Sequence, residues 1–158
     1  MIRLVTAMGL LASFAACAAP APDPQLGPVP VTGNVETPEL DAAIAKWEST
    51  GMDDYTMTVR RTCFCPVPDY TGPFQVTVRT GELAEVSLDG SIVEAERGAT
   101  VASLFDLLRD AYDRQAETVM VEYHPDLGYP ISISIDYDTR MADEEIGYTV
   151  TDFSATTG

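Results

Sequence analysis

The stretch TCFCP contains two cysteines, Cys63 and Cys65, that are separated by one residue. Such a pair could form a disulfide, bind a metal ion or carry out redox chemistry. Side chains at positions i and i+2 of a strand lie about 6–7 Å apart. A disulfide needs β-carbons roughly 3.5–4.5 Å apart. A bond therefore requires a bend, and Pro66 favours the end of a strand at this point. We expect a local disulfide, with two buried thiols or a redox or metal pair as the alternatives.

The cysteine pair lacks the features that a redox or metal site normally has. The C-x-C spacing differs from the C-x-x-C motif at a helix start, which lowers the pKa of a thiol. With His124, the only histidine, the pair still falls short of the four ligands of a structural zinc site. No serine or cysteine nucleophile stands in a recognisable motif to use His124 as a base. We expect His124 at a hairpin corner, no cofactor, and a protein that is not an enzyme.

An acidic stretch near the C-terminus, DYDTRMADEE, is a second candidate site. Its carboxylates belong to Asp136, Asp138, Asp143, Glu144 and Glu145. Carboxylates at this density could bind calcium, but Met141 takes the sixth position, where an EF-hand loop has glycine. Arg140 also adds a positive charge. We interpret the stretch as a solvated acidic hairpin and predict no metal site, with a calcium-binding module as the alternative function.

The N-terminal residues predict export and a lipid anchor. Arg3 precedes an apolar run of the size of a secretory signal, too short for a membrane-spanning helix, which needs roughly 20 residues. FAAC at 14–17 resembles a bacterial lipobox, which implies a signal peptide over 1–16 and acylation of Cys17. Cleavage at an A-x-A site is the alternative. Ala18 then favours the outer membrane of a bacterial envelope, facing the periplasm. In that oxidising compartment the two remaining cysteines form an even pair.

Composition separates a tether from one folded domain. Residues 17–36 are proline-rich and lack hydrophobic periodicity, so we expect a tether that precedes a single domain over 37–158. The chain carries a formal net charge of −16, from 9 basic and 25 acidic residues. Loss of Arg3 leaves 8 basic residues and a charge of −17. This balance argues against nucleic acid, since phosphate contacts need clustered Lys and Arg, and favours cationic proteins or divalent cations.

Helices and strands must position these residues. Apolar side chains recur at helical spacing from Leu40 to Trp47 and from Val101 to Leu108. Elsewhere the period is two, which is typical of antiparallel strands with one wet face. The order is α-β-β-β-α-β-β-β, and the echo of GPFQVTV in GYPISIS suggests duplication of an α-β-β-β unit. We predict an α+β fold, a curved antiparallel sheet of about six strands with two helices on one face.

The sheet face without helices is predicted to be open and polar. It would display Thr56, Thr58, Arg60, Gln75, Thr77, Arg79, Ser132, Ser134, Thr149 and Thr151. Short side chains make such a face flat, and ordering them on docking costs little entropy. We therefore predict a non-enzymatic binding module that meets a protein partner through this face, with Arg60 and Arg79 as binding residues.

Several marks together resemble one known family. Trp47 is followed by DYTMTV and CFCP, then by VTVRTGEL, TVASLF, VEYHPDLGYPISISIDYD and DEEIGYTV. This combination, over about 40–158, looks like the bacterial family catalogued as domain of unknown function 6174, which contains small secreted proteins and lipoproteins. His124 stands where an acidic residue is expected in that pattern. The resemblance implies an exported α+β domain and brings no activity, substrate or catalytic residue.

Overall fold

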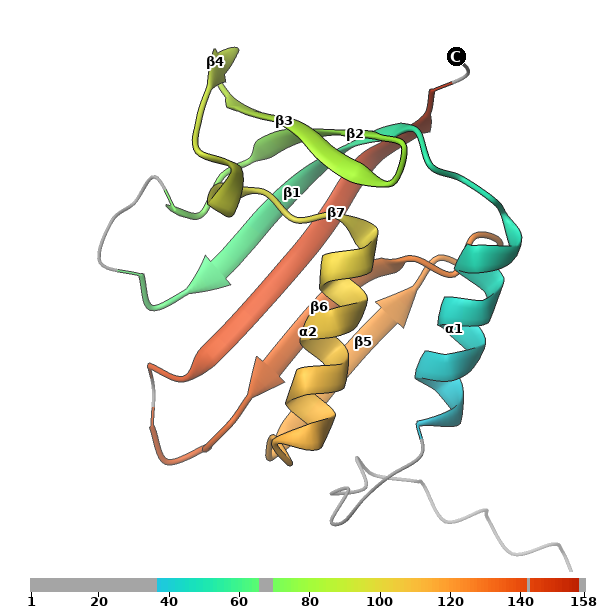
Figure 1. Ribbon diagram of the computed structural model, residues 1–158. Coiled ribbons are helices and arrows are strands. Elements are labelled where there is room, and N and C mark those ends of the chain that lie inside the picture. The colour runs from blue at the N-terminus through green and yellow to red at the C-terminus, as the bar shows by residue number, and fades with distance from the viewer. Residues whose placement is uncertain (1–36, 66–69, 142, 157–158) are drawn as a thin grey trace, which may run out of the picture.

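The alternating pattern folds as an antiparallel sheet of seven strands, with both helices on one face (Figure 1). The computed structural model describes residues 37–65, 70–141 and 143–156, so the predicted signal peptide, Cys17 and the tether lie outside the described residues. In chain order the elements are α1 (Pro38–Ser49), β1 (Tyr55–Cys63), β2 (Phe74–Arg79), β3 (Glu82–Leu88), β4 (Ser91–Ile92), the 3-10 turn η2 (Ala95–Arg97), α2 (Val101–Asp113), β5 (Thr118–Tyr123), β6 (Pro130–Asp136) and β7 (Glu145–Ala155).

The predicted α+β fold is confirmed, with seven strands in place of about six. The additional strand is β4, which pairs with the end of β3 through Ser91 and Ile92. A strand of two residues is too short to show a period in the sequence. Its formation depends instead on the turn at Asp89 and Gly90, both of which have positive φ.

The strand order β4-β3-β2-β1-β7-β6-β5 joins the two halves of the chain at the centre of the sheet. Each half forms a meander after its helix, as expected of two α-β-β-β units. The strands β1 and β7 pair over most of their length, from Tyr55 opposite Ala155 to Cys63 opposite Ile146. This central pair fixes which residues of the two halves lie side by side.

The core lies between the helices and the sheet. Inward positions of the strands, including Met57, Phe74 and Ile135, are almost fully buried. The same holds for the apolar stripe of α2, while α1 buries Leu40, Ala43 and Ile44. Burial of apolar surface is the main stabilising contribution in such a layered fold.

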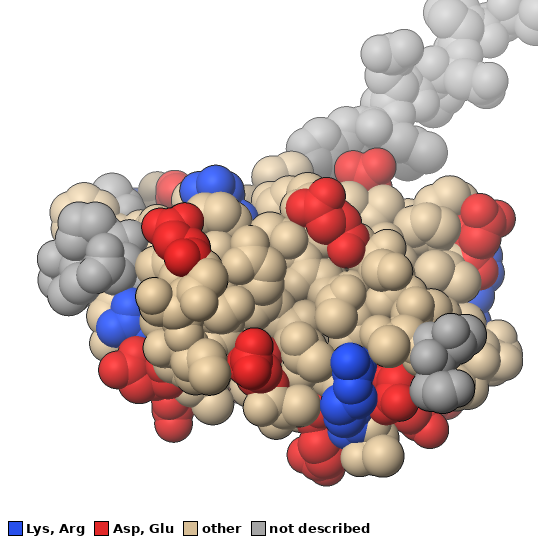
Figure 2. Space-filling view, turned by 90° about the horizontal axis from the view of Figure 1, so that it is seen from above, with Lys and Arg blue, Asp and Glu red and all other residues tan. Residues whose placement is uncertain are grey.

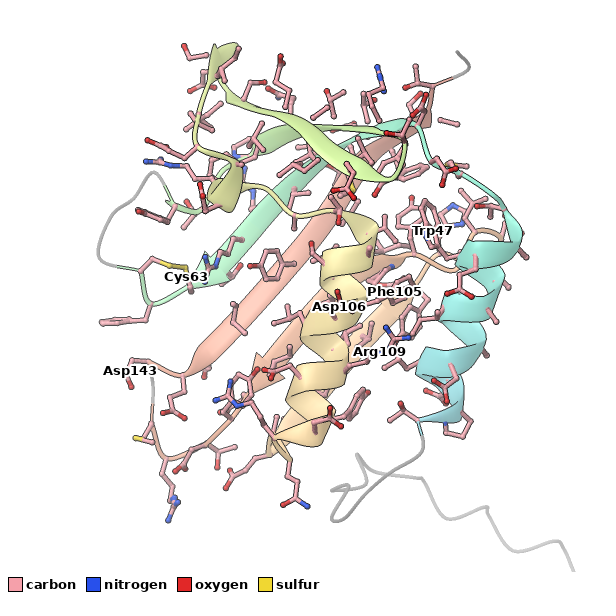
Figure 3. The ribbon with its side chains drawn as sticks, viewed as in Figure 1. Trp47, Cys63, Phe105, Asp106, Arg109 and Asp143 are labelled. Atoms are coloured by element: carbon pink, nitrogen blue, oxygen red, sulfur yellow. A yellow bond between two sulfur atoms is a disulfide. The ribbon has the colours of Figure 1, made fainter. Side chains whose placement is uncertain are left out.

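Local interactions hold the helices in place. Thr100 and Ser103 form a reciprocal capping box at the start of α2, which satisfies N–H groups that have no partner within the helix. The hydroxyl of Tyr55 accepts a further hydrogen bond from the Val101 N–H, at 3.0 Å. At α1, the Trp47 ring meets Tyr55 edge-on, with the ring centroids 5.5 Å apart (Figure 3).

Neither helix is both long and apolar enough to cross a membrane, within the part of the chain that the structure describes.

Candidate functional site

The sheet face turned away from the helices carries the residues predicted to form the open surface. We call it the outer face; it consists of Thr56, Thr58, Arg60, Gln75, Thr77, Arg79, Ser132, Ser134, Thr149 and Thr151, all of them half-buried or exposed. The register brings residues from separate strands together: Arg60 lies opposite Thr149 on β7, and Thr149 lies opposite Ser132 on β6. The period-two pattern thus correctly predicted the composition of this face.

Arg60 stands in a hollow of the outer face. The hollow measures about 450 Å³ and is lined by Thr58, Arg60, Pro73, Gln75, Thr149, Thr151 and Asp152. The Arg60 side chain is exposed and makes no ion pair or hydrogen bond with any of the described residues. The hollow places this guanidinium beside three threonines, Gln75 and Asp152. A guanidinium whose five donors are free of the described residues can donate to a carboxylate or a carbonyl oxygen.

Arg79, the second predicted binding residue, lies at the far end of the same strand pair. Arg60 is one residue beyond the Val59–Phe74 pair, whereas Arg79 is one residue beyond the Tyr55–Val78 pair. Six strand residues separate the two positions, a distance of roughly 20 Å. The Arg79 side chain donates to its neighbour's backbone, the Val78 carbonyl, at 2.9 Å. The two arginines share a face but do not form one cluster.

A second hollow on the outer face follows from a missing side chain. Gly147 lies between Thr62 on β1 and Ser134 on β6 in the sheet register. With no side chain at this position, the surface sinks and forms a hollow of about 380 Å³, which Phe64 also lines. The outer face therefore has two shallow polar depressions, and Thr149 lines both.

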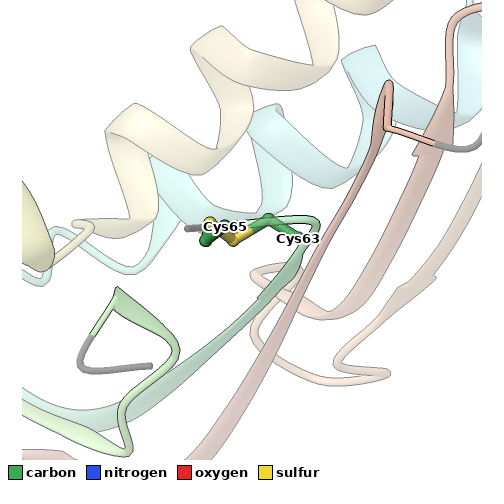
Figure 4. Close-up of a disulfide and its surroundings, with 2 residues drawn as sticks. All are labelled: Cys63 and Cys65. Atoms are coloured by element: carbon green, nitrogen blue, oxygen red, sulfur yellow. A yellow bond between two sulfur atoms is a disulfide. The ribbon is translucent and has the colours of Figure 1, made fainter. Parts of the chain in front are cut away.

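The cysteine pair lies at the end of β1, as the prolines predicted. The structure joins Cys63 and Cys65 as a disulfide, with Cα atoms 5.2 Å apart (Figure 4). The strand ends at Cys63, so the chain bends where the bond needs it. Phe64, between the two cysteines, has 79% of its surface exposed. Thiol counting tests this pairing.

Two features at this end of the sheet were missed by sequence reasoning. The first is the exposed ring of Phe64. The second is Arg61, whose guanidinium lies 5.8 Å from the Tyr148 ring centroid and whose Nε is buried with no hydrogen-bond partner among the described residues. Burial raises the pKa of the Tyr148 hydroxyl, and the nearby Arg61 charge lowers it by a smaller amount. The sequence could have indicated Arg61, because the period-two pattern of β1 predicts that its side chain faces inward.

The carboxylates of the acidic hairpin are spread along the connection between β6 and β7. Asp138 accepts from Arg140 through both carboxylate oxygens, at 2.8 Å each, and these hydrogen bonds lower the pKa of Asp138. Asp136 ends β6, and one of its oxygens is buried without a hydrogen-bond partner among the described residues. Asp143, Glu144 and Glu145 lie across the connection, toward β7. No group of three potential ligands gathers within the described ranges, which leave out residue 142.

His124 occupies the predicted corner between β5 and β6. Its Nδ1 accepts from the N–H groups of Asp126 and Leu127, at 3.2 and 3.1 Å. Its ring stacks on Tyr129 with the centroids 5.0 Å apart. Both interactions hold the turn, so the local geometry uses this imidazole as a structural acceptor.

A family model described as a family of unknown function (DUF6174) matches residues 39–155. The chain belongs to DUF6174. The match spans every helix and strand that the structure describes except the first residue of α1, Pro38. No curated protein and no solved structure matches the chain. The family resemblance drawn from the CFCP and GYP marks is therefore confirmed, while the DUF6174 description assigns no activity to any residue.

Proposed function

We propose that this DUF6174 chain is a non-enzymatic binding module that docks a protein partner on its outer face. The observation that carries the proposal is Arg60, an exposed cation without an ion pair or hydrogen bond to the described residues, in a hollow that three threonines, Pro73, Gln75 and Asp152 also line. Arg60 would receive a carboxylate of the partner. The hydroxyls of Thr58, Thr149 and Thr151 around it would exchange hydrogen bonds with partner backbone groups.

The proposed setting is the surface of a bacterial membrane. Acylation of Cys17 would anchor the chain in the outer membrane, facing the periplasm, after removal of 1–16. The proline-rich tether up to residue 36 could then hold the domain up to about 60 Å from the anchor, at about 3.1 Å per residue. Such reach would let the outer face turn toward a partner in the envelope.

Photo-crosslinking from the outer face tests the proposal. A photoreactive side chain at Thr149, which lines both hollows, should form one dominant crosslinked protein in intact envelope. The same group at Ala102, an exposed position of α2 on the helical side, should not. Equal crosslinking from both positions would show that contact with the outer face is not specific.

Charge reversal on the purified complex supplies the second measurement. Arg60→Glu should weaken binding of the crosslinked partner at least about tenfold, in the range of losses at interface anchors. Arg79→Glu, roughly 20 Å away along the strands, should weaken it less. Arg109→Glu on α2, an exposed arginine paired only with Asp106, is the matched control. Unchanged affinity for Arg60→Glu, with an unchanged melting temperature, would reject the outer face as the binding surface.

A further inference from the structure

Phe64 is a large apolar side chain in an unusual position. It has the greatest exposed fraction, 79%, of the exposed large hydrophobic residues in the described part of the chain. It also lies between the two cysteines joined at the end of β1. The disulfide closes a loop of three residues with Phe64 at its centre, and this loop limits the backbone freedom of Phe64. The aromatic side chain therefore loses little entropy if it enters a pocket of another molecule. Aromatic residues presented in this way often dominate binding energy.

A hollow beside Phe64 is lined by apolar side chains and by three neighbouring carboxylates, Asp143, Glu144 and Glu145, which we call the acidic rim. It measures about 410 Å³ and opens between the end of α2 and the ends of β1 and β7. Leu107 and Ile146, both half-buried, supply apolar surface, and Asp143, Glu144 and Glu145 stand on the β7 side. Cys63 and Asp143 lie at this same end of the molecule (Figure 3).

Two arginines, Arg61 and Arg114, also line the hollow, and each contacts an aromatic ring. Arg114 pairs with Asp110 at 3.3 Å, and its guanidinium lies 4.0 Å from the Tyr137 ring centroid. Arg61 faces Tyr148. By contrast, the three rim carboxylates form no ion pair or hydrogen bond within the described ranges.

The acidic rim continues the charge of the whole chain, which has a net charge of −16. In the view from above, red carboxylates outnumber blue cations (Figure 2). Like charges repel at an interface. A second copy of this chain is therefore a poor occupant. The tether is poor as well, because residues 17–36 contain Asp23 and Glu36 and no Lys or Arg.

We propose that Phe64, Leu107, Ile146, Asp143, Glu144 and Glu145 form a second docking surface, the Phe64 surface, for a basic segment of a partner protein. The Phe64 ring would enter an apolar pocket of the partner, and one or more Lys or Arg side chains of the partner would face the three carboxylates. Phe64, Glu145 and Ile146 also line the Gly147 hollow at the edge of the outer face. The Phe64 surface shares no residue with the hollow around Arg60, so the inference does not depend on binding at Arg60.

Titration with defined peptides tests the Phe64 surface on the folded chain. The probes are two synthetic helical peptides of equal length and equal leucine content, one carrying lysines and the other glutamates at its polar positions. With the lysine peptide, amide NMR signals of residues 61–65 and 143–146 should shift at peptide concentrations that leave the β4 signals unchanged. The affinity should fall as salt is added, because charge attraction is screened. The glutamate peptide should not bind.

Matched variants separate an anchor from general charge attraction. Phe64→Ala should weaken the lysine peptide at least about tenfold. Ile92→Ala, which removes another exposed apolar side chain, 74% exposed and on β4, should leave the affinity unchanged. Reversal of the rim charges by Asp143→Lys and Glu144→Lys should also weaken binding, whereas Glu85→Lys on β3 should have little effect. Thermal melts confirm that each variant is folded.

Three results would overturn the inference. The first is equal binding by the Phe64→Ala and Ile92→Ala variants, which would reduce the interaction to diffuse charge attraction. The second is binding of the glutamate peptide at the same residues. The third is concentration-dependent self-association that Phe64→Ala abolishes, since this would make a second copy of the chain the occupant. Unchanged partner affinity in Arg60→Glu would contradict the outer-face proposal alone, because Arg60 does not line the hollow beside Phe64, and it would leave these results unaffected.

Discussion

At the scale of single residues, Gly128 lets the β5–β6 connection lie directly against α1. Its φ is +81°, and an added β-carbon would lie 2.5 Å from the Ala43 carbonyl oxygen. Gly128→Ala should therefore lower the free energy of unfolding through both backbone strain, about 1–3 kcal/mol, and the clash with α1. Urea unfolding measures the loss.

Gly81→Ala is the control for Gly128→Ala. Gly81 has a similar φ of +78°, but an added β-carbon there would meet nothing within 4 Å. The control should show the cost of strain alone, so the difference between the two variants reports the contact with α1. Equal destabilisation of the two variants would contradict the packing of this connection against α1.

Tyr55 links the central strand β1 to the start of α2. Its hydroxyl accepts from the buried Val101 N–H, and burial raises the pKa of this hydroxyl, with the Val101 hydrogen bond lowering it by a smaller amount. Tyr55→Phe should reduce the free energy of unfolding by about 1–3 kcal/mol, because the N–H is left without an acceptor. Tyr137→Phe, whose hydroxyl makes only an exposed contact with Asp110 at 3.4 Å, should change it little. If Tyr55→Phe leaves the free energy of unfolding unchanged, the Tyr55 hydroxyl is not needed as the acceptor for the Val101 N–H, and water takes its place.

Thiol counting decides the state of Cys63 and Cys65. In protein carrying Cys17→Ser, only these two cysteines remain. A structural disulfide predicts no reactive thiol either in the native state or in denaturant. Two buried thiols would react only after unfolding. A redox pair would be reduced in the native state by a glutathione buffer, because an exposed or strained disulfide has a higher reduction potential.

At the scale of elements, the sequence was sufficient for some features and insufficient for others. Helical spacing found both apolar stripes, and period-two alternation found six of the strands and the side of the sheet that most of their residues face. Ala84 was expected on the inward side of β3, but it is exposed and Leu83 packs against the core instead, because the register shifts between Thr77 and Val78 in the β2–β3 pair. The two-residue β4, the shift of register between Thr56 and Thr58 and the hollow at Gly147 depend on pairing between distant strands. Pairing of that kind is set by tertiary packing and leaves little trace in local periodicity.

The connection between β6 and β7 is tied to the segment after α2. The Glu117 carboxylate accepts from the hydroxyl and the N–H of Thr139, at 2.6 and 2.8 Å. These hydrogen bonds lower the pKa of Glu117 from its ordinary value. A carboxyl with a lowered pKa in the folded state stabilises that state above its ordinary pKa, and the contribution disappears as the pH falls through the folded pKa.

Thr139→Ala should raise the pKa of Glu117 toward its ordinary value, because it removes the hydroxyl donor. An NMR titration of the Glu117 carboxyl carbon measures this shift. Thr151→Ala is the control, since that hydroxyl donates to Asp152 instead and should leave the Glu117 titration unchanged. A Glu117 midpoint that Thr139→Ala does not move would show that the connection is not held to this carboxylate in solution.

At the scale of the whole molecule, the two proposed surfaces present opposite charges to a partner. The outer face offers Arg60, which pairs with none of the described residues, in a hollow that three threonines also line, and the Phe64 surface offers a rim of carboxylates beside an exposed ring. A partner that meets both surfaces would need acidic and basic regions at matching positions. Opposite charges at separate positions fix the orientation of a complex better than a uniformly charged surface does.

The anchor determines where such a complex could form, and Cys17→Ser tests it. If Cys17 is acylated, the native chain should sediment with membranes and carry a mass increase from its acyl chains. Cys17→Ser should abolish both, because the proposed attachment has no second hydrophobic anchor in the described domain, where neither helix could cross a bilayer. The double variant Cys63→Ser and Cys65→Ser is the control and should stay with the membranes, since those cysteines lie in the folded domain. If the native chain stays in the supernatant and its mass shows no acyl chain, acylation of Cys17 is contradicted and cleavage at the A-x-A site is favoured.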